Sequence, residues 1–124
     1  MADLIFNKGK GTLTAFGRVW SAVAGATQLQ PLSPGAYSVP PGALKTGTEP
    51  AQGVTLDTAY AFPAFKDRTG FGWFLWLGRG NLGIHPRGAV PGMHGGIEVT
   101  NIDTRALFNE LHKRNGQSLS VSVE

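Results

Sequence analysis

Two histidines and a set of glycines stand close together in residues 80–99. His85 ends an apolar segment, a loop rich in proline and glycine follows, and His94 precedes Gly95 and Gly96 before the chain turns apolar again. Imidazole can act as a general base near neutral pH, and glycines at positive φ can aim successive backbone N–H groups at an anion. The pattern is typical either of a site for an oxyanion or carboxylate between two strands, or of a turn with two incidental histidines.

The same stretch resembles the active-site segment of the L,D-transpeptidase catalytic (YkuD-type) family, above all its short-loop form in phage-borne and secreted-toxin relatives. The matching segments are Leu82-Gly83-Ile84-His85-Pro86 and Val90-Pro91-Gly92-Met93-His94-Gly95. Gly96 occupies the position of the family's nucleophilic cysteine, and the chain contains no cysteine. The resemblance implies His85 as the base and the Gly95 and Gly96 amides as oxyanion donors. It also implies that this chain cannot form the family's covalent acyl-enzyme intermediate.

This resemblance implies processing or recognition of peptidoglycan stem peptides, with transpeptidation, amino-acid exchange or trimming as the activity of an intact relative. Without the cysteine, we expect binding of stems without turnover, either by a natural pseudoenzyme or by a variant whose nucleophile was replaced. The candidate substrate-binding residues are His94, Arg79 and Tyr37. Arg79 follows a buried apolar strand, from which its guanidinium could bind a substrate carboxylate in a bidentate manner. Glu98 stands where the family has Asn or Arg, and an acid there could repel a stem carboxylate.

Two other functions fit the same residues. His85, His94 and Glu98 could ligate zinc and leave a fourth position for water, although the spacing from His94 to Glu98 suits a helix better than the predicted loop and strand. Alternatively, the groove could bind a partner protein, such as an immunity protein or a component of a phage particle or secretion apparatus. Bound zinc in the purified protein would favour the first alternative, and protection of loop 40–53 from proteolysis would favour the second. Apart from the zinc alternative, no metal or cofactor is expected.

The composition indicates a single globular domain over residues 1–124. Hydrophobic side chains make up 41% and charged side chains 15% of the chain, which suits a packed core. The net charge of +3 comes from scattered Lys and Arg residues without interleaved aromatics, so nucleic acid is not the expected partner. Neither a signal peptide nor an apolar run of about 20 residues is visible, so we expect no membrane span. Phage, lysis or a secretion apparatus would then carry the protein from the cytoplasm to the bacterial cell wall or periplasm.

Alternating apolar residues between glycines and prolines predict short strands that position the candidate site. Strands are expected over residues 4–6, 12–16 and 18–25, the first two as a hairpin. Pro34 and Gly35 introduce a further strand that carries Tyr37 and Val39 on one face. A long loop over 40–53, either a lid or a tolerated insertion, precedes an interrupted strand within 54–65 and a strand over 71–77 that is apolar on both faces.

A helix is expected within residues 101–116, with Asp103 or Thr104 as its cap and the apolar Leu107, Phe108 and Leu111 on one face. A strand over 118–123 follows. Trp20 and most aromatic residues of 71–77 are expected in the core rather than along a sugar-binding groove, and His112 on the surface. The expected fold is mainly β, a sandwich or partly closed barrel with one C-terminal helix, and the resemblance implies the L,D-transpeptidase β-sandwich.

Overall fold

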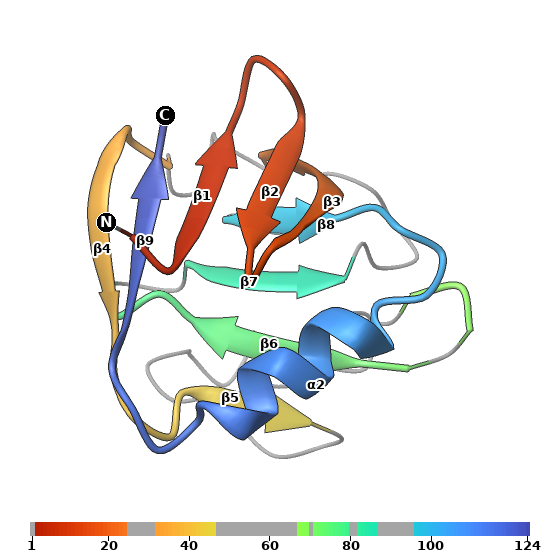
Figure 1. Ribbon diagram of the computed structural model, residues 1–124. Coiled ribbons are helices and arrows are strands. Elements are labelled where there is room, and N and C mark those ends of the chain that lie inside the picture. The colour runs from red at the N-terminus through yellow and green to blue at the C-terminus, as the bar shows by residue number, and fades with distance from the viewer. Residues whose placement is uncertain (1, 25–31, 47–66, 70, 80–81, 87–95) are drawn as a thin grey trace.

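The computed structural model describes residues 2–24, 32–46, 67–69, 71–79, 82–86 and 96–124, which form nine strands and one helix (Figure 1). The strands join one sheet in the order β4-β9-β1-β2-β3-β8-β7-β6-β5, which is nearly closed into a barrel. The prediction of a mainly β, partly closed fold with a C-terminal helix is confirmed. The elements are β1 (Leu4–Asn7), β2 (Thr12–Ala15), β3 (Arg18–Ala24), β4 (Gly35–Val39), β5 (Leu44–Thr46), β6 (Trp73–Trp76), β7 (Gly83–Pro86), β8 (Ile97–Val99), α2 (Arg105–Lys113) and β9 (Leu119–Val123).

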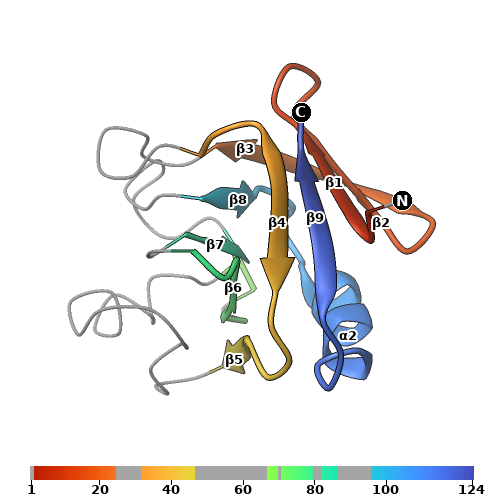
Figure 2. The same cartoon turned by 90° about the vertical axis from the view of Figure 1, so that its left-hand side faces the viewer.

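The order of strands in the sheet departs from their order along the chain at two places. β9 lies between β4 and β1, antiparallel to the first and parallel to the second. β3 pairs with β2 through residues 18–21 and with β8 through residues 22–24. It therefore belongs to both halves of the sheet, and the sheet bends at this strand. As a result, β5 to β8 run across the direction of β4 and β9 (Figure 1), which stand next to each other in the side view (Figure 2).

Phe16 and Gly17 form the two-residue turn between β2 and β3. Their φ values are 53° and 75°, and positive φ at both central residues is what a type I′ hairpin turn requires. Gly17 adopts this conformation without steric cost, whereas the β-carbon of Phe16 makes the same conformation unfavourable. The guanidinium of Arg114 lies 4.1 Å from the centre of the Phe16 ring, and this contact offsets part of that cost.

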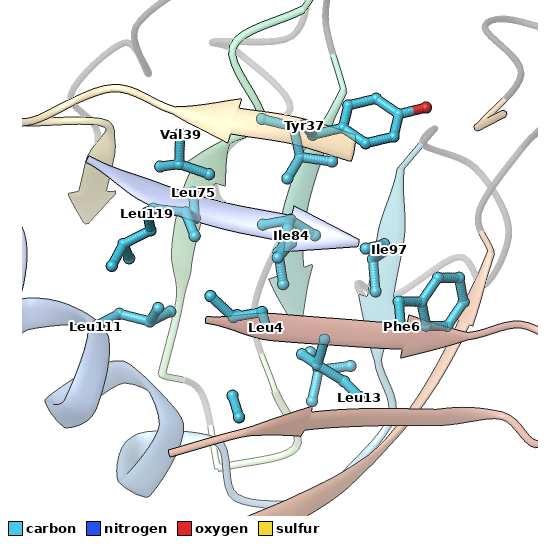
Figure 3. Packing of buried hydrophobic residues seen from close by; sticks show 14 of the residues in the cluster. Leu4, Phe6, Leu13, Tyr37, Val39, Leu75, Ile84, Ile97, Leu111 and Leu119 are labelled. Carbon is cyan, nitrogen blue, oxygen red and sulfur yellow. The ribbon is translucent and has the colours of Figure 1, made fainter. Parts of the chain in front are cut away.

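The core fills the space between the two halves of the sheet. Alternate residues of each strand point inward, which explains why the predicted patterns of β1, β4 and β9 are matched by their burial. Trp20 is 3% exposed and belongs to this core, as predicted. Each aliphatic side chain buried in this way contributes about 1.5–3 kcal/mol. The residues labelled in Figure 3 are Leu4, Phe6, Leu13, Tyr37, Val39, Leu75, Ile84, Ile97, Leu111 and Leu119.

Helix α2 packs on the barrel through Leu107 and Leu111, which are buried as its apolar pattern predicts. Phe108 meets the ring of Phe71 edge to face at 5.0 Å. Thr104 is the N-cap residue, but its side chain makes no capping hydrogen bond. The helix therefore begins at one of the two predicted cap residues, although the Thr104 hydroxyl donates to a buried carboxylate rather than to the helix end. Asp103 Oδ1 accepts from the N–H of Arg105 at 2.9 Å and is the side chain that satisfies this helix end.

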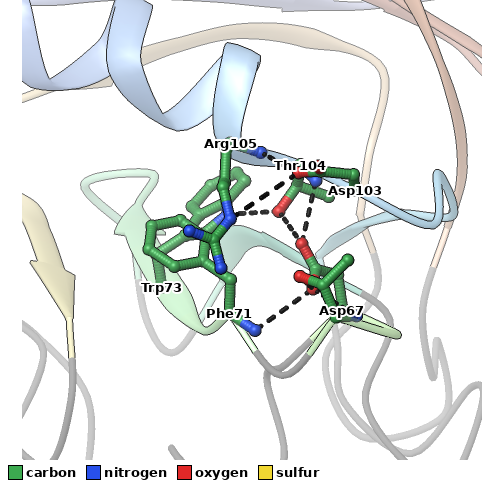
Figure 4. A network of polar contacts seen from close by, with 7 residues as sticks. Asp67, Phe71, Trp73, Asp103, Thr104 and Arg105 are labelled. Atoms are coloured by element: carbon green, nitrogen blue, oxygen red, sulfur yellow. Dashed lines mark hydrogen bonds and ion pairs between the residues drawn. The ribbon is translucent and has the colours of Figure 1, made fainter.

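That buried carboxylate is Asp67, which fastens the segment before β6 to the start of α2 (Figure 4). Its Oδ1 accepts from the N–H and hydroxyl of Thr69 and from the N–H of Phe71, and its Oδ2 accepts from the N–H and hydroxyl of Thr104. Trp73 Nε1 donates to the same Thr104 oxygen at 2.8 Å. Burial by itself raises the pKa of Asp67, but the hydrogen bonds from Thr69, Thr104 and Phe71 outweigh it and lower the pKa below its ordinary value.

One prediction about the connections is wrong. Residues 44–46, expected within a long loop, form β5 and pair with β6. The sequence there has no clear strand pattern, but Leu44 packs in the core and the backbone completes the sheet beside Leu75. Tertiary pairing thus overrides a weak local preference. The rest of the predicted loop, from residue 47, and the predicted strand within 54–65 lie outside the described residues.

Candidate functional site

His85 is the predicted base, and the structure places it inside β7. β7 (Gly83–Pro86) forms because one of its faces fills the core, with Ile84 fully buried. His85 points to the opposite face, and it too is 0% exposed. Its Nδ1 lies 2.9 Å from the carbonyl oxygen of Pro86. A carbonyl can only accept, so Nδ1 carries the proton in this contact.

Glu98 is the direct neighbour of His85 across the sheet. β7 and β8 are parallel, with His85 opposite Glu98 and Ile84 opposite Ile97. The two isoleucines face the core, so the imidazole and the carboxylate share the other face. Glu98 is 1% exposed. A pair of buried ionisable groups therefore lies on adjacent strands, an arrangement that is costly unless each group finds polar partners.

Phe74 completes this face from β6. Its ring is stacked on the imidazole of His85, with centroids 5.9 Å apart and the planes only 5° from parallel. The sequence predicted that the 71–77 strand is apolar on both faces, and Phe74 and Trp73 are both buried as expected. The contact with His85 was not predicted, because no pattern within either strand defines how β6 and β7 are paired.

Gly96 stands at the predicted nucleophile position and is held against β7. Its φ is +96°, a conformation that favours glycine. A β-carbon there would lie 2.2 Å from the carbonyl oxygen and 2.8 Å from the nitrogen of Gly83. Both atoms belong to backbone that is fixed in the sheet, so they have little freedom to move aside. The local fold therefore requires glycine at position 96.

Arg79 and Tyr37, two of the predicted substrate-binding residues, are brought together from distant parts of the chain. Arg79 follows β6 and is exposed, and its guanidinium carbon lies 4.3 Å from the centre of the Tyr37 ring. Tyr37 is 3% exposed and its hydroxyl donates to the carbonyl oxygen of Ser33 at 2.7 Å. The buried ring therefore orients an exposed guanidinium, a group suited to bidentate binding of a carboxylate.

Two of the predicted site residues have no described position. His94 and Gly95 lie outside the described residues, so the predicted oxyanion donors and the third substrate-binding residue stay predictions.

Comparisons with family models, curated proteins and solved structures found no match for this chain. Within the described ranges, no three His, Cys, Asp or Glu side chains are grouped to hold a metal ion. No helix in the same ranges is long and apolar enough to span a membrane.

Proposed function

We propose that this protein recognises peptidoglycan stem peptides on an L,D-transpeptidase-like scaffold without forming a covalent intermediate. The observation that carries the proposal is the pairing of β7 and β8, which sets an oriented, buried His85 next to the strand that begins after Gly96. Their spacing along the chain is that of the family's base and nucleophile positions. The target would be the bacterial cell wall, reached through a phage, lysis or a secretion apparatus.

The absence of a thiol is consistent with recognition rather than acyl transfer. The chain has no cysteine, and the close approach of Gly96 to Gly83 leaves no space for one at the family position. Imidazole nitrogens can exchange hydrogen bonds with a ligand amide, so the proposal assigns ligand binding to His85. We therefore favour a natural recognition protein over an enzyme that was inactivated by replacement of its nucleophile.

The first prediction concerns His85. Replacing His85 by Gln is expected to weaken binding of a disaccharide tetrapeptide by about tenfold, since one hydrogen bond to the ligand contributes about 1–1.5 kcal/mol. Titration calorimetry of the purified protein with defined muropeptides measures the change. The matched control is His112→Gln, because His112 is exposed on α2 and lies in another part of the fold.

Several outcomes of this titration would contradict the proposal. If the native protein binds no muropeptide, the stem-recognition function is wrong. Equal loss of affinity in both histidine variants would show that the effect does not come from the site. Stoichiometric zinc in protein purified without added metal, lost in the His85 variant, would favour the metal-site alternative instead.

A second prediction concerns the carboxylate of the ligand. Replacing Arg79 by Met keeps the apolar contact with Tyr37 and removes the guanidinium. We expect affinity for a stem with a free terminal carboxylate to fall about 10- to 100-fold, as charge-assisted hydrogen bonds contribute about 1.5–3 kcal/mol. Affinity for the C-terminally amidated stem should change little.

The control for this experiment is Arg18→Met. Arg18 is also exposed and also lies over a buried ring, 5.2 Å from the centre of Trp20. If Arg79→Met weakens the free and amidated stems equally, or if Arg18→Met has the same effect, Arg79 does not bind the ligand carboxylate and its role is limited to packing on Tyr37.

A further inference from the structure

Strand β4 lies at one edge of the sheet. Among the described strands it pairs only with β9, and the side view shows β9 next to it (Figure 2). A strand at the edge of a sheet presents backbone N–H and carbonyl groups that the sheet itself does not use. Gly35, Ala36 and Ser38 of this strand are exposed, so the edge of β4 lies at the surface of the molecule.

Two contacts show which residues of β4 turn their backbone away from β9. In an antiparallel pair, residues that bond to the partner strand alternate with residues that point away from it. Ser120 is opposite Ser38, and its carbonyl oxygen accepts from the N–H of Asp3 on the other side of β9, at 3.0 Å. The carbonyl oxygen of Ser38 faces Gly78. Ser38 and, two residues earlier, Ala36 therefore direct their N–H and carbonyl groups outward.

The turn after β6 covers the edge at Ser38. Gly78 has a φ of +75°, and a β-carbon on it would overlap the Ser38 carbonyl oxygen. Only glycine permits this close approach. At Ala36, in contrast, no described residue forms a hydrogen bond with the outward N–H or carbonyl. The accessible donor and acceptor of this edge are therefore those of Ala36.

Arg79 adds a positive charge beside Ala36. Its guanidinium lies over the ring of Tyr37, and the Tyr37 hydroxyl reaches back to the carbonyl oxygen of Ser33 at 2.7 Å. The ring, with the guanidinium over it, therefore extends toward the start of β4. No acidic side chain of the described residues forms an ion pair with Arg79. A donor, an acceptor and a cation that lie together in this way suit the carboxyl end of an extended peptide.

We propose that the edge of β4 binds the end of the stem peptide by addition of an antiparallel strand. The third stem residue exchanges two backbone hydrogen bonds with Ala36, and the carboxylate of the fourth residue binds Arg79. An antiparallel ligand directs its carboxyl end toward the start of β4, which is the end where the guanidinium lies. The proposal rests on the proposed function, because that function supplies the identity of the ligand.

Hydrogen exchange of the Ala36 amide, followed by NMR, tests this placement directly. In the free protein the amide faces water, and saturation with a disaccharide tetrapeptide should slow its exchange by about tenfold. A tetrapeptide that is N-methylated at the third residue cannot donate to the Ala36 carbonyl. We expect the native protein to bind it about tenfold more weakly. The matched control is N-methylation at the fourth residue, whose N–H points away from β4 and should not affect binding.

A pair of variants tests the same pairing from the side of the protein. Ala36→Pro removes the outward N–H, which the sheet does not use, and proline is tolerated at such positions of edge strands. Its affinity for the tetrapeptide should fall about tenfold. Ala36→Thr keeps the N–H and should bind as the native protein does. Should Ala36→Pro fail to fold, the N-methylated ligands test the pairing with the native protein.

The possible failures can be told apart. The edge proposal alone is wrong if the tetrapeptide binds but leaves exchange of the Ala36 amide unchanged, or if methylation at the third residue does not weaken binding. It is also wrong if exchange slows with rising protein concentration in the absence of ligand, because a second copy would then occupy the edge. If the native protein binds no muropeptide, both the proposed function and the edge proposal are refuted.

Discussion

Installing cysteine at position 96 is expected to destabilise the protein strongly and not to create a transpeptidase. The new β-carbon would meet the backbone of Gly83, with its carbonyl oxygen at 2.2 Å, and the φ of +96° would be strained for any residue with a side chain. Strained backbone and overpacking each cost about 1–3 kcal/mol. Together they remove a large part of the about 5–15 kcal/mol by which a domain is stable. Thermal and urea unfolding of Gly96→Cys measure this loss.

The contribution of the close contact can be separated from that of the backbone angle. Gly17 also has positive φ, 75°, but nothing lies within 4 Å of a β-carbon built on it. Gly17→Cys should therefore lose only the conformational term, about 1–2 kcal/mol. If Gly96→Cys is as stable as Gly17→Cys and forms an acyl adduct with muropeptides, detected by mass spectrometry, the scaffold is a competent enzyme that lacks its nucleophile. The recognition proposal would then have to be abandoned.

Replacing Asp67 by Asn is expected to have the second large effect. The carboxylate accepts hydrogen bonds from Thr69, Phe71 and Thr104 through both of its oxygens. An Asn side chain has only one acceptor oxygen, and its NH₂ group would face donors on the other side. Because hydrogen bonds to a charged group contribute about 1.5–3 kcal/mol, we expect a loss of about 2–4 kcal/mol in the free energy of unfolding, measured by urea denaturation at pH 7.

The pH dependence of the same variant gives an independent check. Hydrogen bonds hold the pKa of Asp67 in the folded protein below its ordinary value, although burial opposes them. The stabilisation is therefore complete above the pKa of the unfolded chain and is lost as the pH falls through the lower folded pKa. The difference in stability between the native protein and Asp67→Asn should be constant near neutrality and shrink in acid, below about pH 4.

Asp103→Asn is the matched control for this network. Asp103 stands one residue before Thr104 and its side chain is 58% exposed. Its Oδ1 accepts from the Arg105 N–H, and an Asn oxygen can accept the same bond, so the loss should stay below about 1 kcal/mol. Two results would show that the Asp67 carboxylate does not link the segment before β6 to α2. One is an equal loss in the free energy of unfolding at positions 67 and 103, and the other is a difference between the native protein and Asp67→Asn that does not shrink in acid.

Patterns within single elements predicted the strands and the helix well. Alternation placed Tyr37 and Val39 on one face, which the structure buries, and helical spacing placed Leu107 and Leu111 on the buried face of the helix. These residues obey local rules because one face of each element is buried and the other is not. The same rules failed at β5, where pairing with β6 rather than local preference determines the strand.

The candidate site was harder to predict from the sequence, because its contacts join residues of different strands. His85 was predicted, but its neighbours Phe74 and Glu98 depend on the register of β6 and β8 against β7, which alternation alone does not define. No local pattern marks Asp67, because its partner Thr104 lies 37 residues away. Arg79 and Tyr37 were chosen separately, and only the curvature of the sheet brings them together.

The placement of β9 has a consequence for how the molecule assembles. β1 and β2 can pair as soon as they have been synthesised, since a short turn connects them. β4, in contrast, is hydrogen-bonded in the sheet to β9, the last strand in the chain. This pairing joins residues 35–39 to residues 119–123, and pairings so distant in the sequence slow folding. Until β9 is in place, β4 and one edge of β1 lack their partner strand, so closing the barrel is a late step of folding during which unpaired strand edges are exposed.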